Sequence, residues 1–236
     1  MQNYKNFSET VRFSAFFCTF AIDMEESKQS TAYRQSLRER IIDTAMHAFA
    51  THGIKAVKMD DIAQYLGISK RTLYEVFDNK EVLLFEGVKK YKSLKEQEMA
   101  QVVSVSNSVM DDILYVYKKK VEEFRQVNPA FYSDMERYPQ VLAFLEEDRR
   151  QSREYMFDFL KRGVAEGYFR QDVDYRLAIV LFEATASYVM EHQLYLQYSI
   201  EEIFHNILFV SLRGICTKRG QDVLDHFTDL TAKASS

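Results

Sequence analysis

The segment from Ser69 to Tyr74 gathers cationic and hydroxyl side chains within little more than one helical turn. Lys70, Arg71 and Thr72 follow a serine, which is a preferred N-cap residue of helices. The N-terminal end of a helix also carries partial positive charge and unpaired backbone N–H groups. This set of donors suits hydrogen bonding to phosphate oxygens and to the edges of nucleic-acid bases.

Two short helices joined by a glycine turn are expected to position these side chains. We expect the helices over 60–66 and 70–77, with Ala63 small enough for a close crossing and Gly67 in a left-handed turn. Apolar residues would pack the pair on a preceding helix (Ile62, Leu66, Ile68, Leu73 and Val76). This spacing is typical of a helix-turn-helix, whose second helix enters the major groove. Two neighbouring helices of an ordinary bundle remain the alternative.

The flanking residues extend the pattern. Apolar residues at helical spacing predict a first helix that ends at Gly53 (Ile41, Ile42, Ala45, Met46 and Phe49). A longer helix follows, for which Asp78 is the expected cap and Glu81 completes a capping box. Residues 36–85 thereby resemble the TetR/AcrR family of regulators, at Gly53, Ile62, Ala63, Gly67, Ser69, Leu73, Tyr74, Phe77, Lys80 and Leu83.

The resemblance implies individual DNA contacts. In the family, the residues that match Tyr74 and Lys80 bind backbone phosphates, and the recognition helix is anchored in the core by the residue that matches Phe77. Residues matching the cationic segment reach bases or phosphates. The candidate DNA-binding residues are therefore Lys58, Ser69, Lys70, Arg71, Thr72, Tyr74, Glu75 and Lys80.

Two positions depart from the family pattern. Met59 stands where a threonine hydroxyl often caps the helix and touches phosphate, so that contact is in doubt. Glu75 occupies a position that is frequently aromatic or basic. A carboxylate there would either accept a hydrogen bond from a cytosine amino group or be solvated.

The charge distribution agrees with a local DNA-binding surface. The whole chain carries a net charge of −4, which is unusual for a nucleic-acid-binding protein. Residues 34–80 contain eight Lys and Arg against six Asp and Glu, a net of +2 that leaves −6 for the remainder. Only the face that contacts DNA has to be basic, so a positive charge on residues 34–80 and a negative charge on the remainder have the required signs.

The composition predicts an all-α protein. Two prolines and seven glycines in 236 residues are too few for the turns of an all-β fold. We expect a three-helix DNA-binding domain over 33–80 and a helical bundle for ligand binding and dimerisation over 81–236. The further helices are expected over 80–103, 109–127, 129–137, 139–166, 173–197, 199–218 and 221–232.

Residues 1–32 form an N-terminal extension of uncertain role. Two basic residues precede the apolar run Phe13 to Ile22, which superficially resembles a signal peptide but is far shorter than the ~20 residues of a membrane span. The acidic residues that follow make a poor cleavage site. We expect either an upstream start with Met24 as the initiator, or a tail packed on the body, in a cytoplasmic protein.

A single helix-turn-helix contacts few base pairs, so a homodimer is expected. The helices over 173–197 and 199–218 are apolar on more than one face and are the candidate interface. The alternative is that both fill the core of one protomer. The candidate interface residues are Leu177, Leu181, Ala184, Tyr188, Ile203, Ile207 and Val210.

The stretch from 111 to 198 is rich in Phe, Tyr and Met, which suit a cavity for an apolar or amphipathic effector of unknown identity. Most such residues belong to cores, and that remains the alternative for each. His192 would supply a polar contact or lie on the surface. The candidate pocket residues are Phe124, Phe131, Tyr155, Phe159, Tyr188 and His192.

No motif of a catalytic or metal site is present in the sequence. Cys18 and Cys216 form no CxxC pair and are expected to be reduced thiols. We therefore expect no enzyme, cofactor or metal. The expected partners are a double-stranded DNA operator, a second copy and a small-molecule effector, without a membrane. The alternatives are an effector-independent architectural DNA-binding protein of the same fold and a binder whose head has lost DNA affinity, which the intact cationic residues oppose.

Overall fold

A computed structural model describes residues 32–234 of the chain. Within this range the regular elements are helical, apart from one isolated antiparallel bridge between Phe169 and Cys216. The all-α prediction is confirmed. The predictions for Met24, Cys18 and the apolar run near the N-terminus lie outside the described residues.

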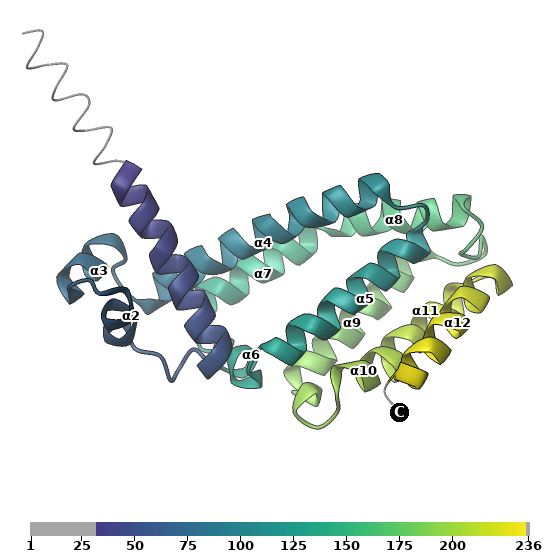
Figure 1. Cartoon of the computed structure of the whole chain (residues 1–236). Helices are drawn as coiled ribbons and strands as arrows, with labels where there is room; N and C mark the ends of the chain where they lie inside the picture. Colours follow the sequence, from purple (N-terminus) through teal and green to yellow (C-terminus); the bar gives the residue numbers. More distant parts are fainter. Residues whose placement is uncertain (1–31, 235–236) are drawn as a thin grey trace, which may run out of the picture.

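Three helices form one end of the molecule, which we call the head (residues 32–79; Figure 1). The first helix covers 32–52, followed by α2 (Met59–Leu66) and α3 (Lys70–Val76). Gly53 ends the first helix with a φ of +84°, and Gly67 ends α2 with a φ of +66°. Both backbones are left-handed, a conformation that glycine adopts without the clash of a Cβ. The turn predicted at Gly67 is confirmed.

The body (residues 80–234) is built from the remaining helices. The 26-residue α4 (Lys80–Val105) leaves the head and runs beside α7, where Lys92 Nζ lies 2.7 Å from Asp148 Oδ1 (Figure 1). The other helices are α5 (Val109–Gln126), α6 (Pro129–Met135), α7 (Pro139–Gln151), α8 (Arg153–Ala165), α9 (Tyr175–Glu191), α10 (Ile200–Ile203), α11 (Phe209–Ile215) and α12 (Lys218–Ala234).

The structure corrects four predicted details of these helices. Asn79, not Asp78, caps α4, with its side chain accepting from the N–H of Val82 at 3.0 Å. The helix expected over 139–166 breaks at Ser152, and the one expected over 173–197 ends at residue 191. The segment expected over 199–218 contains a π-helical stretch between α10 and α11. No glycine or proline marks these breaks in the sequence, so breaker residues could not reveal them.

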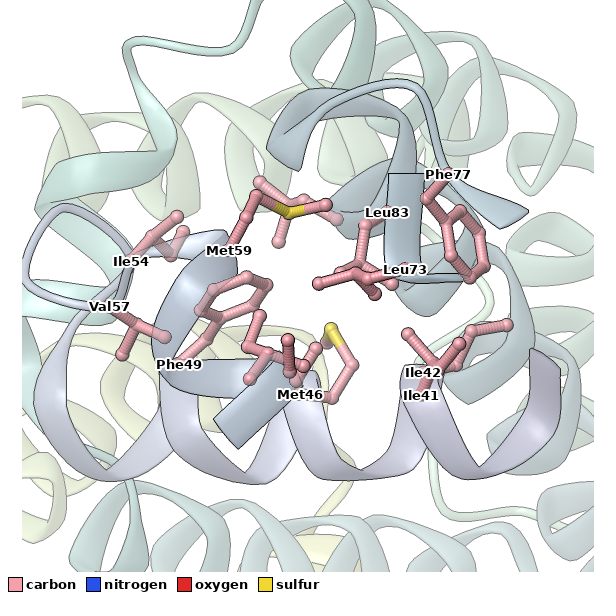
Figure 2. Packing of buried hydrophobic residues seen from close by; sticks show 14 of the residues in the cluster. Ile41, Ile42, Met46, Phe49, Ile54, Val57, Met59, Leu73, Phe77 and Leu83 are labelled. Carbon is pink, nitrogen blue, oxygen red and sulfur yellow. The ribbon is translucent and has the colours of Figure 1, made fainter. Parts of the chain in front are cut away.

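A buried apolar cluster holds the head together (Figure 2). Phe49 of the first helix, Leu73 of α3 and Phe77 point into it, and all three are almost fully buried. Figure 2 also shows Leu83 of α4 in this cluster, and Val141 of α7 belongs to it. The core of the head therefore continues into the first turn of α4 and onto α7, which fixes the orientation of α3 relative to the body.

A second cluster fills the body among α5, α8, α9, α11 and α12. Its centre is aromatic, with the ring of Tyr117 within 5.1–5.7 Å of Phe204, His205, Phe209 and Phe227. Rings at these separations contribute packing energy beyond their buried area. The first cluster therefore joins the head to the adjoining parts of α4 and α7, and the second lies wholly within the body.

Candidate nucleic-acid interface

The α3 helix is fixed on one side and exposed on the other. Leu73 is 0% exposed and Phe77 is 2% exposed, which locks the helix onto the core of the head. Lys70, Arg71 and Tyr74 face solvent. Because burial and exposure alternate at helical spacing, the cationic and hydroxyl donors share one outward face.

Ser69 caps α3 as predicted. Its Oγ accepts a hydrogen bond from the N–H of Thr72 at 3.0 Å, and the two side-chain hydroxyl oxygens lie 2.8 Å apart. Thr72 is only partly exposed. These two hydroxyls therefore organise the start of α3, and Lys70, Arg71 and Tyr74 form its outward surface.

Both cations at the start of α3 are paired with carboxylates. Lys70 Nζ donates to Asp60 of α2, and Arg71 Nε donates to Glu75 Oε1 at 2.8 Å. The neighbouring carboxylates raise the pKa of Lys70 and of Arg71 above their ordinary values. The two cations therefore stay charged, and Glu75, for which a solvated carboxylate was one expectation, is held in an ion pair.

Lys80 has a different placement from the one that its family role implies. Its ammonium donates to the carbonyl oxygens of Ile54 at 2.8 Å and Val57 at 2.9 Å, in the turn between the first helix and α2. Partial burial lowers the pKa of Lys80. In this structure the side chain ties α4 to the head, and its expected phosphate contact would require these bonds to open.

Lys58 and Met59 form the start of α2. Lys58 is exposed, and its backbone N–H donates to Asp61 Oδ2 at 2.9 Å. Met59 is buried in the head core. The helix start is therefore stabilised from within by Asp61, since methionine offers no hydroxyl for capping or for phosphate.

Asp60 is a site residue that sequence reasoning did not identify. It lies ten positions before Lys70, and no local periodicity relates the two. Only the crossing of α2 and α3 brings them together. The i, i+4 spacing of Arg71 and Glu75 was, in contrast, a readable signal for an ion pair on one helix.

The candidate dimer residues differ in how far their side chains are exposed. On α9, Leu177, Leu181, Ala184 and Tyr188 are exposed, and so is Val210 on α11. The exposed Val180 extends the same apolar surface. Ile207 is partly buried. Ile203 is 3% exposed, so this prediction is corrected: its side chain packs inside the protomer and is not available to a second copy.

The candidate pocket residues do not surround one cavity. Tyr155 is 81% exposed, and the rings of Tyr188 and His192 stack at 3.9 Å on the surface. Phe159 packs against the body core. Two pockets on the body, of about 690 and 490 Å³, are lined by none of the six. The six residues therefore line neither of these two pockets, and their role in binding an effector stays a prediction.

Two of these residues do lie together. Phe124 of α5 stacks on Tyr132 of α6 at 4.7 Å, and Phe131 meets the same ring edge-on at 5.5 Å. Tyr195 joins them at 5.7 Å from Tyr132. Burial raises the pKa of Tyr132 to about 12. The aromatic cluster (Phe124, Phe131, Tyr132 and Tyr195) thus joins α5, α6 and the segment after α9.

The described residues lack two other kinds of site. No helix within 32–234 has the length and apolarity needed to cross a bilayer. Across the same residues, no three His, Cys, Asp or Glu side chains are grouped so that they could hold a metal ion. Cys216 is buried, which raises the pKa of its thiol to about 11.

Comparisons with known proteins agree with this geometry. Residues 41–86 match the family model described as bacterial regulatory proteins, tetR family. The HTH-type transcriptional repressor KstR2 of Mycolicibacterium smegmatis is 27% identical over 192 residues, covering 78% of this chain and 93% of that protein.

Solved structures share the fold. The ketosteroid transcriptional regulator KstR2 of Mycobacterium tuberculosis is 22% identical with a TM-score of 0.51, over 77% of this chain and 95% of that one. A TetR-family regulator from Agrobacterium tumefaciens is 18% identical with a TM-score of 0.62, over 78% and 100%. These relatives are all named as regulators or repressors of transcription. The chain therefore carries, on a three-helix head with an exposed α3, the N-terminal domain of the tetR family of bacterial regulatory proteins, and its most similar relatives include repressors of transcription.

Proposed function

We propose that this chain represses transcription by binding a double-stranded DNA operator as a homodimer, and that a small apolar or amphipathic effector bound by the body releases it. The observation that carries the proposal is that α3 has one buried face and one exposed face. Leu73 and Phe77 are buried in the head, and Lys70, Arg71 and Tyr74 are exposed to solvent. A helix anchored in this way can enter the major groove as a rigid element. The name of the KstR2 relative as a repressor supports the direction of regulation.

The exposed stripe of α9 supports the homodimer. Leu177, Leu181, Ala184 and Tyr188 are spaced so that they share one face of the helix, and all are exposed in the protomer. A contiguous apolar surface of this kind marks a protein interface in a soluble monomer. Pairing it with its copy would give two α3 helices at a fixed spacing, as two operator half-sites require.

The helix α6 provides a route from effector to head. At its start, the N–H of Asn128 donates to the carbonyl oxygen of Ala50 at 2.7 Å. Further along, Asp134 accepts from the N–H of Lys55 at 2.6 Å. Its other face carries Tyr132 of the aromatic cluster. An effector that displaces this cluster would tilt the end of the first helix, and it has to bind the displaced state more tightly to shift the population.

The relatives also suggest the character of the effector. The KstR2 protein of Mycobacterium tuberculosis is named a ketosteroid transcriptional regulator, which indicates a largely apolar ligand for that protein. We propose an effector of the same character here, with aromatic side chains of the body against its apolar surface.

The test begins with selection of duplexes from a random pool by the purified full chain. Arg71→Ala and Tyr74→Phe should then weaken binding to every duplex, because each variant loses a hydrogen-bond donor to the phosphate backbone. Tyr91→Phe is the matched control, since Tyr91 is also exposed but lies on α4. Unchanged binding by both α3 variants would refute the interface.

The effector is tested on the selected duplex with a panel of steroid and fatty-acyl compounds. Release by any of them supports a ligand-controlled repressor. Binding that no compound relieves would favour the effector-independent architectural protein.

A further inference from the structure

Two ion pairs hold the cations at the start of α3. Lys70 is paired with Asp60, and Arg71 with Glu75 at 2.8 Å. The four side chains are 47–88% exposed, so each pair lies on the surface that faces DNA in the proposed function. Docking of α3 on a duplex must therefore separate these pairs or accommodate their carboxylates.

The pairs contribute little to the fold, because exposed ion pairs are weak. Their consequence lies in binding. A carboxylate brought against DNA is repelled by phosphates, unless a base offers it a hydrogen-bond donor. In the major groove, the cytosine amino group is the donor that Glu and Asp accept from. Phosphate contacts by Lys and Arg carry no sequence information of their own.

We infer that Asp60 and Glu75 determine specificity for the DNA sequence. They hold Lys70 and Arg71 in ion pairs, and only a cognate half-site offsets the loss of these pairs on binding. The inference rests on the proposed function, namely DNA binding through α3. A cognate half-site presents a cytosine amino group to Glu75, and the hydrogen-bonded carboxylate then orients Arg71 toward an adjacent guanine. A duplex without that cytosine leaves Glu75 facing phosphates with no donor, so its binding is suppressed.

The same pairs affect the salt dependence of non-specific binding. When Lys70 or Arg71 moves to a phosphate, a counterion leaves the DNA, but the abandoned carboxylate takes up a cation from solution. The two effects offset each other. Removing the charge of Asp60 or Glu75 should therefore steepen the slope of log K against log salt by up to about one for each carboxylate.

The experiment compares Glu75→Gln and Asp60→Asn with the parent chain. Asp43→Asn is the matched control, because Asp43 is an exposed carboxylate on the first helix, paired with Lys90 Nζ at 2.7 Å and not with α3. Affinity is measured for the duplex enriched by the parent and for a scrambled duplex of equal composition, over a range of salt. Circular dichroism confirms that each variant is folded.

We expect Glu75→Gln and Asp60→Asn to bind the scrambled duplex about tenfold more tightly than the parent does, with a steeper salt slope and a smaller specificity ratio. The control should behave as the parent. Selection repeated with Glu75→Gln should replace cytosine by adenine at one position of each half-site, since glutamine pairs with adenine.

Specificity ratios and salt slopes equal to those of the parent in both Glu75→Gln and Asp60→Asn would overturn the inference while leaving DNA binding intact. An unchanged base preference in Glu75→Gln would overturn the role of Glu75. Failure of the parent to enrich any duplex would instead refute the proposed function, and the inference with it.

Discussion

Replacing Gly53 by alanine tests the contact between the head and α6. Gly53 has a φ of +84°, and a Cβ at this position would lie 2.9 Å from Ala130 Cβ and 3.2 Å from Asp134 Oδ2. The left-handed backbone costs an alanine about 1 kcal/mol. Pushing the new methyl group against α6 adds about 1–3 kcal/mol of overpacking. We expect Gly53→Ala to lower the free energy of unfolding by about 2–4 kcal/mol.

Gly67→Ala is the matched control for this prediction. Gly67 has a φ of +66°, but no atom lies within 4 Å of its added Cβ. The control therefore carries the backbone strain without the steric clash, and it should cost about 1 kcal/mol. Urea unfolding of the full chain at one fixed protein concentration measures both, because the stability of a dimer depends on concentration.

A second substitution isolates the cost of the steric clash between the new methyl group and α6. Ala130→Gly removes the methyl group that Gly53→Ala would meet, so the double variant should recover part of the loss relative to the two single variants. Equal costs for Gly53→Ala and Gly67→Ala, or strictly additive effects in the double variant, would refute a tight contact between α6 and the end of the first helix.

Three further predictions concern other contacts. Lys80→Met should lower the free energy of unfolding by about 2 kcal/mol, because the carbonyl oxygens of Ile54 and Val57 lose a charged donor. Loss of DNA affinity with an unchanged unfolding midpoint would instead show that Lys80 contacts phosphate and does not stabilise the head. Leu181→Glu should give a folded monomer in sedimentation, since Leu181 is exposed in the protomer, and a persistent dimer would exclude the α9 stripe. The raised pKa of Tyr132, about 12, means that its contribution to stability is complete below the ordinary value of 10.0 and is lost as the pH rises through 12. Tyr132→Phe should remove tyrosinate absorbance that develops near pH 12 in a titration, and a loss of absorbance that develops near pH 10 would contradict its burial.

The head was the most predictable part of the chain. Ala63, Gly67, Ser69 and Leu73 lie within a few residues of one another, and each has a local physical reason for its position. The left-handed turn, the serine cap and the buried face of α3 were all obtained in this way. Sequence spacing is sufficient here because a helix-turn-helix is made by contacts between neighbours in the chain.

The body was less predictable, although its helical class was clear from the scarcity of glycine and proline. The break at Ser152 and the π-helical stretch after α10 have no breaker residue to mark them. Ile203 and Val210 were assigned to one interface, yet one is buried and the other exposed. Hydrophobicity alone does not distinguish a residue that packs within the protomer from one that packs on a second copy.

The sequence by itself determined that α3 carries Lys70, Arg71 and Tyr74 on one face, because helical periodicity depends only on position along the chain. Only the tertiary structure decided which groups those side chains meet. The crossing of α2 and α3 brings Asp60 to Lys70, and the start of α4 brings Lys80 to the carbonyl oxygens of the turn before α2. These contacts join residues ten or more positions apart, so their formation depends on how whole helices pack.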